Sequence, residues 1–356
     1  MTDTDGQEPE ILLERRGALG VITLNRPKAL NALTLTMIEE MDKVLHAWAE
    51  DDSVAAVAIQ GAGEKSYCAG GDVRAVWQAG KDGDSLTRDF FWEEYSLNHD
   101  LHHFSKPIVA LIDGITMGGG VGVSIHCSHR VAGSRTLFAM PETAIGFFPD
   151  VGGSYFLPRF PGKTGLYLAM TGDRLKAADC CLVGVANHHV GERDKAEVLE
   201  ALASADLSGH ADSKVTEVLN ALEVEPGRPP LAENSAAIDR IFAAPSVGEI
   251  LEGLEKEGTP WAAATLETLR KRSPFSVVLA FELIHRGAEL SFDDCMTMEF
   301  RVSQALMAGG DFYEGIRAVL VEKDHAPKWN PASIEQVDPA KVVACFEPLG
   351  EGDLTF

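Results

Sequence analysis

The chain has 356 residues, of which 45% are hydrophobic and 24% charged, the composition of an ordinary globular protein with a sizeable core. Its longest apolar runs are too short to span a bilayer, and its formal net charge of −23 argues against a protein that binds nucleic acid through a basic surface. The acidic first residues, MTDTDGQEPE, lack the features of a secretory signal or a mitochondrial presequence, so residues 1–10 are predicted to form a disordered leader of a cytoplasmic protein.

The first half of the chain predicts alternating strands and helices. Residues Val21–Asn25 and Val54–Gln60 are short β-branched apolar runs, typical of buried strands. Between them, apolar residues recur at three- and four-residue spacing. This spacing predicts a helix that is capped by Thr34 or Thr36 and ends near Asp51. The strand–helix–strand order indicates parallel pairing through crossover connections.

A third buried strand is predicted at Ile108–Ile112, and it leads through three glycines into a helix over residues 121–129. Two short strands and a turn rich in Pro and Gly follow at residues 130–133, 137–140 and 141–153. Beyond about residue 201 the chain is expected to be helical, with a linker at 223–230 and helices at Ser276–Leu290, Phe292–Met307 and Asp311–Lys323.

The cysteines and histidines give no sign of a disulfide or a metal site. Six cysteines form neither a C-x-x-C pair nor a spacing typical of metal ligands. The adjacent Cys180 and Cys181 fit positions in a helix better than a disulfide, so reduced thiols are expected. The doublets His102-His103 and His188-His189 lack partners at ligand spacing, and no metal is predicted.

Two glycine loops are candidates for ligand contact. Gly118, Gly119 and Gly120 lie between a buried strand and a helix, where glycine lets the backbone approach a ligand closely and free N–H groups favour an anion. A thioester carbonyl that gains negative charge and a phosphate both fit, and so does a plain tight turn. The second loop, Cys68–Asp72, is by itself more typical of a turn. Together the two loops can supply the two main-chain donors of an oxyanion hole.

Carboxylates are the next candidates for chemistry. Glu142 and Asp150 flank one turn in an otherwise apolar stretch, which favours raised pKa values and general acid–base catalysis. The alternative is a pair of surface carboxylates or helix caps. Glu93 and Glu94 form a similar pair, but two acids on a helix usually face water.

Four segments in order resemble the crotonase (enoyl-CoA hydratase/isomerase) family. They are Leu24–Leu33 (LNRPKALNAL), Tyr67–Asp72 (YCAGGD), Lys106–Gly120 and Pro141–Gly153, with a shorter match at Asp311–Gly315. The resemblance implies an α/β fold in which ββα turns form a crotonase-type spiral core. The core is expected over residues 11–200, followed by a helical insertion and a helical C-terminal region over residues 201–356.

The resemblance also implies an acyl-CoA substrate, whose thioester carbonyl would lie in an oxyanion hole formed by the amides of Gly71 and Gly119. An acidic protein that binds the polyanion CoA must gather its cations locally. The residues expected to bind substrate and line the CoA pocket, the basic ones as phosphate ligands, are Arg26, Lys28, Ala29, Leu30, Asp72, Arg74 and Lys323. Because CoA is part of the substrate, no separate cofactor is expected.

Departures within the family bear on the reaction. Hydratases of the family carry one catalytic Glu two residues after the third glycine, where this chain has Gly122, and a second Glu that is retained as Glu142. Asp150 replaces a usual glycine. These features resemble the branch that hydrolyses 3-hydroxyisobutyryl-CoA in valine breakdown. In that branch Glu142 would be general base or nucleophile, Asp150 would assist by protonation or by positioning water, and Glu94 would bind the 3-hydroxyl.

Three functions are therefore carried forward. The first is a hydrolase of a short-chain 3-hydroxyacyl-CoA thioester, the second a hydratase or isomerase of the same fold, and the third a non-catalytic CoA-binding protein. The acyl-CoA small molecule is the expected partner, with no nucleic acid or membrane. For assembly two alternatives stay open: a homo-oligomer, a trimer or larger, because the family often forms trimers, or a chain whose extra helical segment covers the surface that such trimers use.

Overall fold

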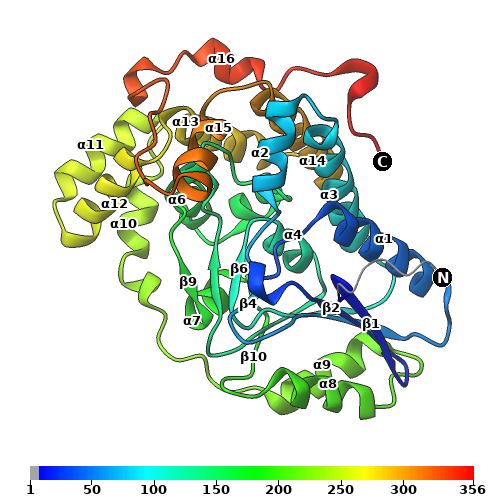
Figure 1. The fold of residues 1–356 in the computed structure, drawn as a ribbon. Coiled ribbons are helices and arrows are strands. Elements are labelled where there is room, and N and C mark those ends of the chain that lie inside the picture. Colours follow the sequence, from blue (N-terminus) through cyan, green and yellow to red (C-terminus); the bar gives the residue numbers. More distant parts are fainter. Residues whose placement is uncertain (1–7) are drawn as a thin grey trace.

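The computed structural model describes residues 8–356, which form an α/β core covered by helices (Figure 1). Residues 1–7 of the predicted leader lie outside the described residues. Pro9 and Glu10 contact the start of the core. The Asn25 side chain donates to the Pro9 carbonyl (2.9 Å) and the Asn25 amide donates to the Glu10 carbonyl (2.7 Å).

Within the described residues, ten strands form two sheets. The larger sheet has the order β1-β2-β3-β5-β7-β10, and its neighbours are parallel apart from the β1–β2 hairpin. The smaller sheet has the order β4-β6-β8-β9. The strands are β1 (Ile11–Arg16), β2 (Leu19–Leu24), β3 (Ala56–Gly61), β4 (Ser66–Cys68), β5 (Ile108–Leu111), β6 (Ile115–Met117), β7 (His129–Ala132), β8 (Leu137–Ala139), β9 (Leu175–Lys176) and β10 (His188–His189).

The chain winds as a spiral because each turn contributes one strand to each sheet. Strands β3, β5 and β7 enter the larger sheet, and the strands that follow them, β4, β6 and β8, enter the smaller one. Helices α2 (Val73–Asp82) and α3 (Leu86–His102) complete the first turn, and α4 (Gly119–Ile125) completes the second. This is the ββα arrangement expected for residues 11–200.

Helices cover both faces of the larger sheet. On one face, α8 (Lys195–Ser204) and α9 (Ala211–Leu222) bury their apolar residues against β2, β3, β5 and β7, and Figure 1 shows the two helices below the sheet. The predicted boundary at residue 200 lies within α8. On the other face, α1 (Leu35–Glu50) begins after Thr34, whose hydroxyl accepts a hydrogen bond from the Met37 amide. The predicted cap and end of this helix are confirmed.

The remaining helices belong partly to the core, as α5 to α7 do, and partly to the C-terminal region, as α10 to α16 do. They are α5 (Gly153–Phe156), α6 (Thr164–Thr171), α7 (Ala177–Val183), α10 (Ser235–Ile241), α11 (Val247–Glu257), α12 (Pro260–Lys271), α13 (Pro274–Gly287), α14 (Phe292–Met307), α15 (Asp311–Ile316) and α16 (Pro339–Ala344). α14 has the predicted bounds. The helix predicted over Asp311–Lys323 is wrong in extent, because α15 ends at Ile316 and a π-helical turn, Arg317–Val321, replaces the rest.

Two other sequence predictions are resolved by the fold. The helix predicted over 121–129 ends at Ile125, because His129 enters β7 and pairs with Val109. Cys180 and Cys181 lie in α7 as expected, and all six cysteines are free thiols. No helix within residues 8–356 combines the length and apolar character that crossing a membrane requires.

Candidate active site

Three of the predicted site segments follow neighbouring strands of the smaller sheet. Gly71 follows β4, Gly119 follows β6, and Glu142 follows β8. These strands are parallel neighbours, so their carboxyl ends meet at one edge of the sheet, where ligands of α/β proteins commonly bind. Segments up to 71 residues apart in the chain therefore converge on one place.

The two glycine loops meet at the start of α4. A Cβ atom built on Gly119 would lie 3.2 Å from the Gly71 amide nitrogen and 3.3 Å from Leu33 Cδ1, so a side chain has no room there. Gly118 has φ +48° and ψ −125°, a conformation that glycine adopts readily. In the part of the chain that is described, neither the Gly71 nor the Gly119 amide donates to a protein acceptor. Two free N–H groups side by side are suited to stabilise an oxyanion.

Glu94 faces this pair of amides from α3. Its side chain is 2% exposed, and a Cβ atom on Gly119 would overlap Glu94 Oε1. Within residues 8–356, Glu94 Oε1 has no hydrogen-bond partner. Burial, followed by the charge of Asp150, raises the pKa of Glu94 well above its ordinary value. The expectation that an acid pair on this helix faces water is therefore wrong for Glu94.

Glu142 and Asp150 lie in the same buried cluster, and each is 5% exposed. Burial, then the charge of Asp150, raises the pKa of Glu142, and burial raises the pKa of Asp150 to about 7. Glu142 Oε1 would be 3.2 Å from a Cβ atom on Gly118. Three acids of this kind, Glu94 included, influence one another's charge, so one can hold a proton while a neighbour accepts one.

Two residues that support Asp150 were missed in the sequence. The Tyr95 hydroxyl donates to Asp150 Oδ2 (3.0 Å). Glu299 on α14 is fully buried and accepts from the Gly152 amide (2.8 Å), the Ser154 amide (2.8 Å) and the Ser154 hydroxyl (2.5 Å). These contacts fix the turn after Asp150. The sequence did contain a signal for Glu299, because it is a polar residue on the apolar face of its helix.

The turn after Asp150 holds an unfavourable backbone conformation. Val151 has φ +52°, which is rare for a β-branched residue and persists only where neighbouring contacts fix it. His126 Nε2 lies 2.8 Å from the Val151 carbonyl oxygen, and Glu299 binds the next amide along the chain. Burial lowers the pKa of His126 to about 3, so a neutral imidazole makes this contact.

Arg26 is engaged within the protein. Its guanidinium pairs with Glu10 (3.0 Å) and Asp72 (3.1 Å) and donates to the Ala32 carbonyl (2.7 Å). Asp72 in addition caps α2 by accepting from the Ala75 amide. These contacts join the LNRPKALNAL segment to the Gly71 loop, and the role of Arg26 at a CoA phosphate stays a prediction.

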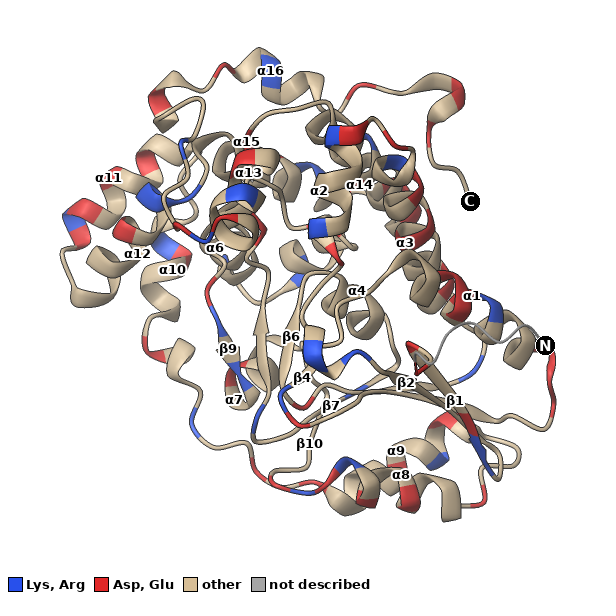
Figure 2. Ribbon diagram, in the orientation of Figure 1, with Lys and Arg blue, Asp and Glu red and all other residues tan. Residues whose placement is uncertain are grey.

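The other expected CoA contacts lie at the rim of the site. Lys28 and Ala29 are exposed in a 3-10 turn after β2, and Leu30 follows with φ +53°. Arg74 and Asp72 line an open cavity of about 550 Å³ together with Val321, two residues before the exposed Lys323. Figure 2 shows basic residues at the base of α2 and in the turn after β2, on a molecule whose helices carry many acids.

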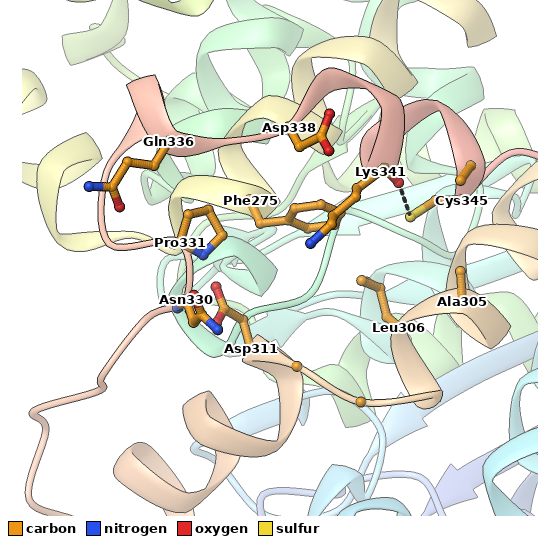
Figure 3. A pocket seen from close by; sticks show the side chains of 13 residues that line it. Phe275, Ala305, Leu306, Asp311, Asn330, Pro331, Gln336, Asp338, Lys341 and Cys345 are labelled. Carbon is orange, nitrogen blue, oxygen red and sulfur yellow. Dashed lines mark hydrogen bonds between the residues drawn. The ribbon is translucent and has the colours of Figure 1, made fainter.

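Other cavities and clusters lie apart from the acids. A cavity of about 440 Å³ near α13, α14 and α16 has Asp311 and Asn330 on one side and Asp338 and Lys341 on the other, and its lining includes no predicted site residue (Figure 3).

Two groups elsewhere have the proximity of metal ligands: His99, His103 and Asp293, and Asp42, His46 and Asp100. His99 and His103 are four residues apart at the end of α3, and Asp42 and His46 are four residues apart on α1, so the expectation that His103 lacks a partner at ligand spacing is wrong. The third member of each group, Asp293 or Asp100, lies on another helix, and sequence spacing could not connect it with the pair. The expected absence of a metal stays a prediction.

A sequence profile described as Enoyl-CoA hydratase/isomerase matches residues 19–346. The chain belongs to the enoyl-CoA hydratase/isomerase family. Two curated relatives are similar over most of their length. The protein named 3-hydroxyisobutyryl-CoA hydrolase, mitochondrial, from Danio rerio is 52% identical over 97% of this chain and 91% of its own length. The Homo sapiens protein of the same name is 44% identical over 99% of this chain and 92% of its own length.

Solved structures of the enoyl-CoA hydratase/isomerase family confirm the crotonase-type fold. A structure titled carnitinyl-CoA dehydratase from Mycobacterium thermoresistibile has a TM-score of 0.92 and 40% identity, covering 98% of this chain and 99% of that chain. One titled enoyl-CoA hydratase from Rhodobacter sphaeroides has a TM-score of 0.90 and 37% identity, covering 98% and 100%. The long helical C-terminal region is therefore part of the shared fold.

The position of Gly122 is closed to a second carboxylate in this family member. A Cβ atom on Gly122 would lie 2.8 Å from Asn98 Nδ2, 3.1 Å from Asn98 Oδ1 and 2.8 Å from Val151 Cβ. The volume that a longer side chain would need is therefore occupied. The acids that remain around the two glycine amides are Glu94, Glu142 and Asp150.

We expect the protein to be less stable at pH 8 than at pH 5. The pKa values of the buried carboxyls Glu94, Glu142, Asp150 and Glu299 are raised, to about 7 for Asp150 and about 8 for Glu299. The folded state then binds more protons than the unfolded state above about pH 4, so this stabilisation is lost as pH rises through the folded pKa values. Each unit of such a shift corresponds to about 1.4 kcal/mol.

Urea unfolding at pH 5, 6, 7 and 8 measures this effect. Asp150→Asn removes one of the groups and is expected to make the fall in unfolding free energy with pH shallower. A free energy of unfolding that increases from pH 5 to pH 8 would contradict the prediction.

Proposed function

We propose that this chain hydrolyses 3-hydroxyisobutyryl-CoA to 3-hydroxyisobutyrate and CoA. The observation that carries the proposal is the convergence of the free Gly71 and Gly119 amides with buried Glu94, Glu142 and Asp150. The relatives named 3-hydroxyisobutyryl-CoA hydrolase support the same substrate, since they are 44–52% identical over nearly the whole chain.

In the proposed reaction the glycine amides, Glu142 and Asp150 each have a separate role. The thioester oxygen accepts hydrogen bonds from the Gly71 and Gly119 amides, which stabilise the negative charge as the carbonyl carbon becomes tetrahedral. Glu142 either removes a proton from the water that attacks that carbon, or attacks the carbon itself to form an anhydride that water then cleaves to free Glu142. In both routes a water oxygen finally replaces the sulfur. The C–S bond breaks, and Asp150 returns a proton to the CoA sulfur.

Glu94 is assigned to the substrate's 3-hydroxyl. With its raised pKa it can exist in the protonated form, in which it both donates and accepts hydrogen bonds. A substrate without the hydroxyl would leave a buried polar group unpaired, at a cost of about 1–3 kcal/mol. This is the physical basis proposed for preferring hydroxylated acyl groups.

The direct test is incubation with 3-hydroxyisobutyryl-CoA while free thiol is measured. Rapid thiol release is expected, with slower release from isobutyryl-CoA. The family and its solved relatives also make crotonyl-CoA a necessary control. Hydration of crotonyl-CoA without thiol release from the hydroxylated substrate would exclude the hydrolase and leave the fold unaffected.

CoA binding is expected to weaken as salt concentration rises, because exposed cations that hold phosphates are screened. The proposed cations are Lys28, Arg74 and Lys323, which are exposed at the rim. Calorimetric titration with CoA at about 0.05 M and 0.5 M salt measures the effect. Arg74→Ala should bind CoA more weakly with a flatter salt dependence. Lys256→Ala on the distant α11 is the control, and equal affinities at both salt concentrations would remove the cations from this role.

Location and assembly are separate proposals. We propose that the protein is cytoplasmic and that it forms a homo-oligomer, the latter because the family often forms trimers. The curated relatives named above carry the word mitochondrial in their names, so localisation of the tagged protein in its own cells is the relevant measurement. Light scattering after size exclusion measures the assembly.

A further inference from the structure

Asn98 is a buried amide in the site that the proposed reaction has not used. It lies on α3, is 0% exposed, and within residues 8–356 neither its Nδ2 nor its Oδ1 has a hydrogen-bond partner. Buried amides are nearly always hydrogen-bonded, because leaving their polar atoms unpaired is unfavourable. An asparagine with both atoms free therefore indicates a ligand that can both donate and accept.

The position of Asn98 connects it to the reacting groups. It follows Glu94 by one helical turn, so the two side chains lie on the same face of α3. Tyr95, which donates to Asp150, precedes Asn98 by three residues and so lies near it on the helix surface. A Cβ atom built on Gly122 would lie 2.8 Å from Asn98 Nδ2 and 2.8 Å from Val151 Cβ. The Asn98 amide therefore lies close to Val151, the residue that follows Asp150.

The unpartnered polar atoms are concentrated at this site. In the described chain, the buried side-chain atoms without a partner are Glu94 Oε1, Glu142 Oε2, Asn98 Nδ2 and Oδ1, and Ser276 Oγ. Glu94 and Glu142 lie against the Gly118–Gly119 loop, and Asn98 lies one turn further along α4, against Gly122. The site thus presents carboxyl oxygens and one neutral amide to whatever occupies it.

We propose that the Asn98 amide binds the water molecule that attacks the thioester, an inference that rests on the proposed hydrolase function. Water is a donor and an acceptor, so it satisfies Oδ1 with one O–H and accepts from Nδ2 through one lone pair. Its second O–H points to a carboxylate of the Glu142–Asp150 pair, which takes that proton as the oxygen bonds to the carbonyl carbon. The C–S bond then breaks and the sulfur receives the proton.

The decisive variant is Asn98→Leu, which keeps the number and branching of the side-chain heavy atoms and removes both hydrogen-bonding atoms. If Asn98 positions the water, kcat for 3-hydroxyisobutyryl-CoA falls by about 10²-fold with KM and CoA affinity nearly unchanged. The melting temperature stays the same or rises, because unpaired polar atoms have been replaced by apolar ones. A residue with a merely structural role would show the reverse, lower stability with kcat retained.

Ser276→Ala is the matched control, because Ser276 Oγ on α13 is also buried and unpartnered. It should leave kcat unchanged. Asn98→Asp is a second variant in case the leucine does not fold. It adds a carboxylate beside Asp150, so the acid limb of the kcat–pH profile should move to higher pH. An unshifted profile would overturn the proposal.

Substrate comparison separates water from the 3-hydroxyl as the ligand of Asn98. Water positioning predicts that Asn98→Leu lowers turnover of 3-hydroxyisobutyryl-CoA and isobutyryl-CoA by the same factor. A loss confined to the hydroxylated substrate would assign Asn98 to the hydroxyl instead, and a folded Asn98→Leu with wild-type kcat would leave it no role in the reaction. If the wild-type protein releases no thiol, the proposed function itself fails. If the wild-type protein releases thiol and the Asn98→Leu protein releases it equally fast, only the assignment of the water to Asn98 fails.

Discussion

Glu142→Gln is expected to lower thiol release from 3-hydroxyisobutyryl-CoA by about 10³-fold or more, while CoA affinity and folding are retained. Glutamine has nearly the same shape as glutamate but is neither a base nor a nucleophile at neutral pH. Glu142 is 5% exposed and lies against Gly118, so no bulk water can take over its function without rearrangement. Steady-state thiol release gives kcat and KM, and calorimetry gives the CoA affinity.

Glu93→Gln is the control for this substitution. Glu93 carries the same carboxyl group and precedes Glu94 on α3, but it is only partly buried, and the charges that raise its pKa after burial are those of Glu39 and Asp89. Its replacement should leave kcat within about threefold of wild type, as is usual for side chains away from the reacting groups. A Glu142→Gln protein with more than about a tenth of wild-type kcat would show that another group is the base or nucleophile.

The strongly periodic parts of this fold could be predicted from the sequence. The apolar spacing before Trp48 and the threonine ahead of it gave α1 with its cap, and α14 has the predicted bounds. The strands β4 and β6 were missed because each has three residues and lies beside a glycine loop. Three residues carry too little periodicity to distinguish a strand from a turn.

Some residues of the site could be predicted from local motifs, whereas others depend on contacts between distant parts of the chain. Motif resemblance was enough to propose Gly71, Gly119, Glu142 and Asp150, which the fold brings together. Glu299 could not be connected with Asp150 in the sequence, because the turn that it holds lies about 147 residues earlier in the chain. Asn98 and Glu94 did carry a signal, since both are polar residues on the apolar face of α3 that includes Phe91 and Leu101.

The chemistry of charged side chains was the least predictable part. Arg26 was selected because its positive charge suits a phosphate. The structure pairs it with Glu10 and with Asp72, which is 46 residues away. A sequence shows that a cation is present, but its availability to a ligand depends on the carboxylates that the fold brings near it. The same argument leaves Arg74 and Lys323 as the more accessible candidates.

Gly119→Ala is expected to lower kcat by about 10²–10³-fold, or about 2.7–4 kcal/mol, the effect of losing one oxyanion donor. The new Cβ atom would lie 3.2 Å from the Gly71 nitrogen and would overlap Glu94 Oε1. It therefore occupies the space between the two amides that the thioester oxygen must enter. Circular dichroism and urea unfolding establish that the variant is folded, and thiol release gives its kcat.

Two further variants identify which contact of the new methyl group matters. Gly248→Ala on α11 is the control for adding a methyl group, because its Cβ would meet only Ser246 Oγ at 4.0 Å, and full activity is expected. Gly119→Ala combined with Glu94→Ala removes the overlap with the carboxyl but leaves the methyl group between the amides. If the oxyanion hole is the cause, this double variant stays as impaired as Gly119→Ala. A double variant with the same turnover as Glu94→Ala alone would instead show that displacement of Glu94 was responsible, and a folded Gly119→Ala protein with unchanged kcat would mean that the glycine loops form only a turn.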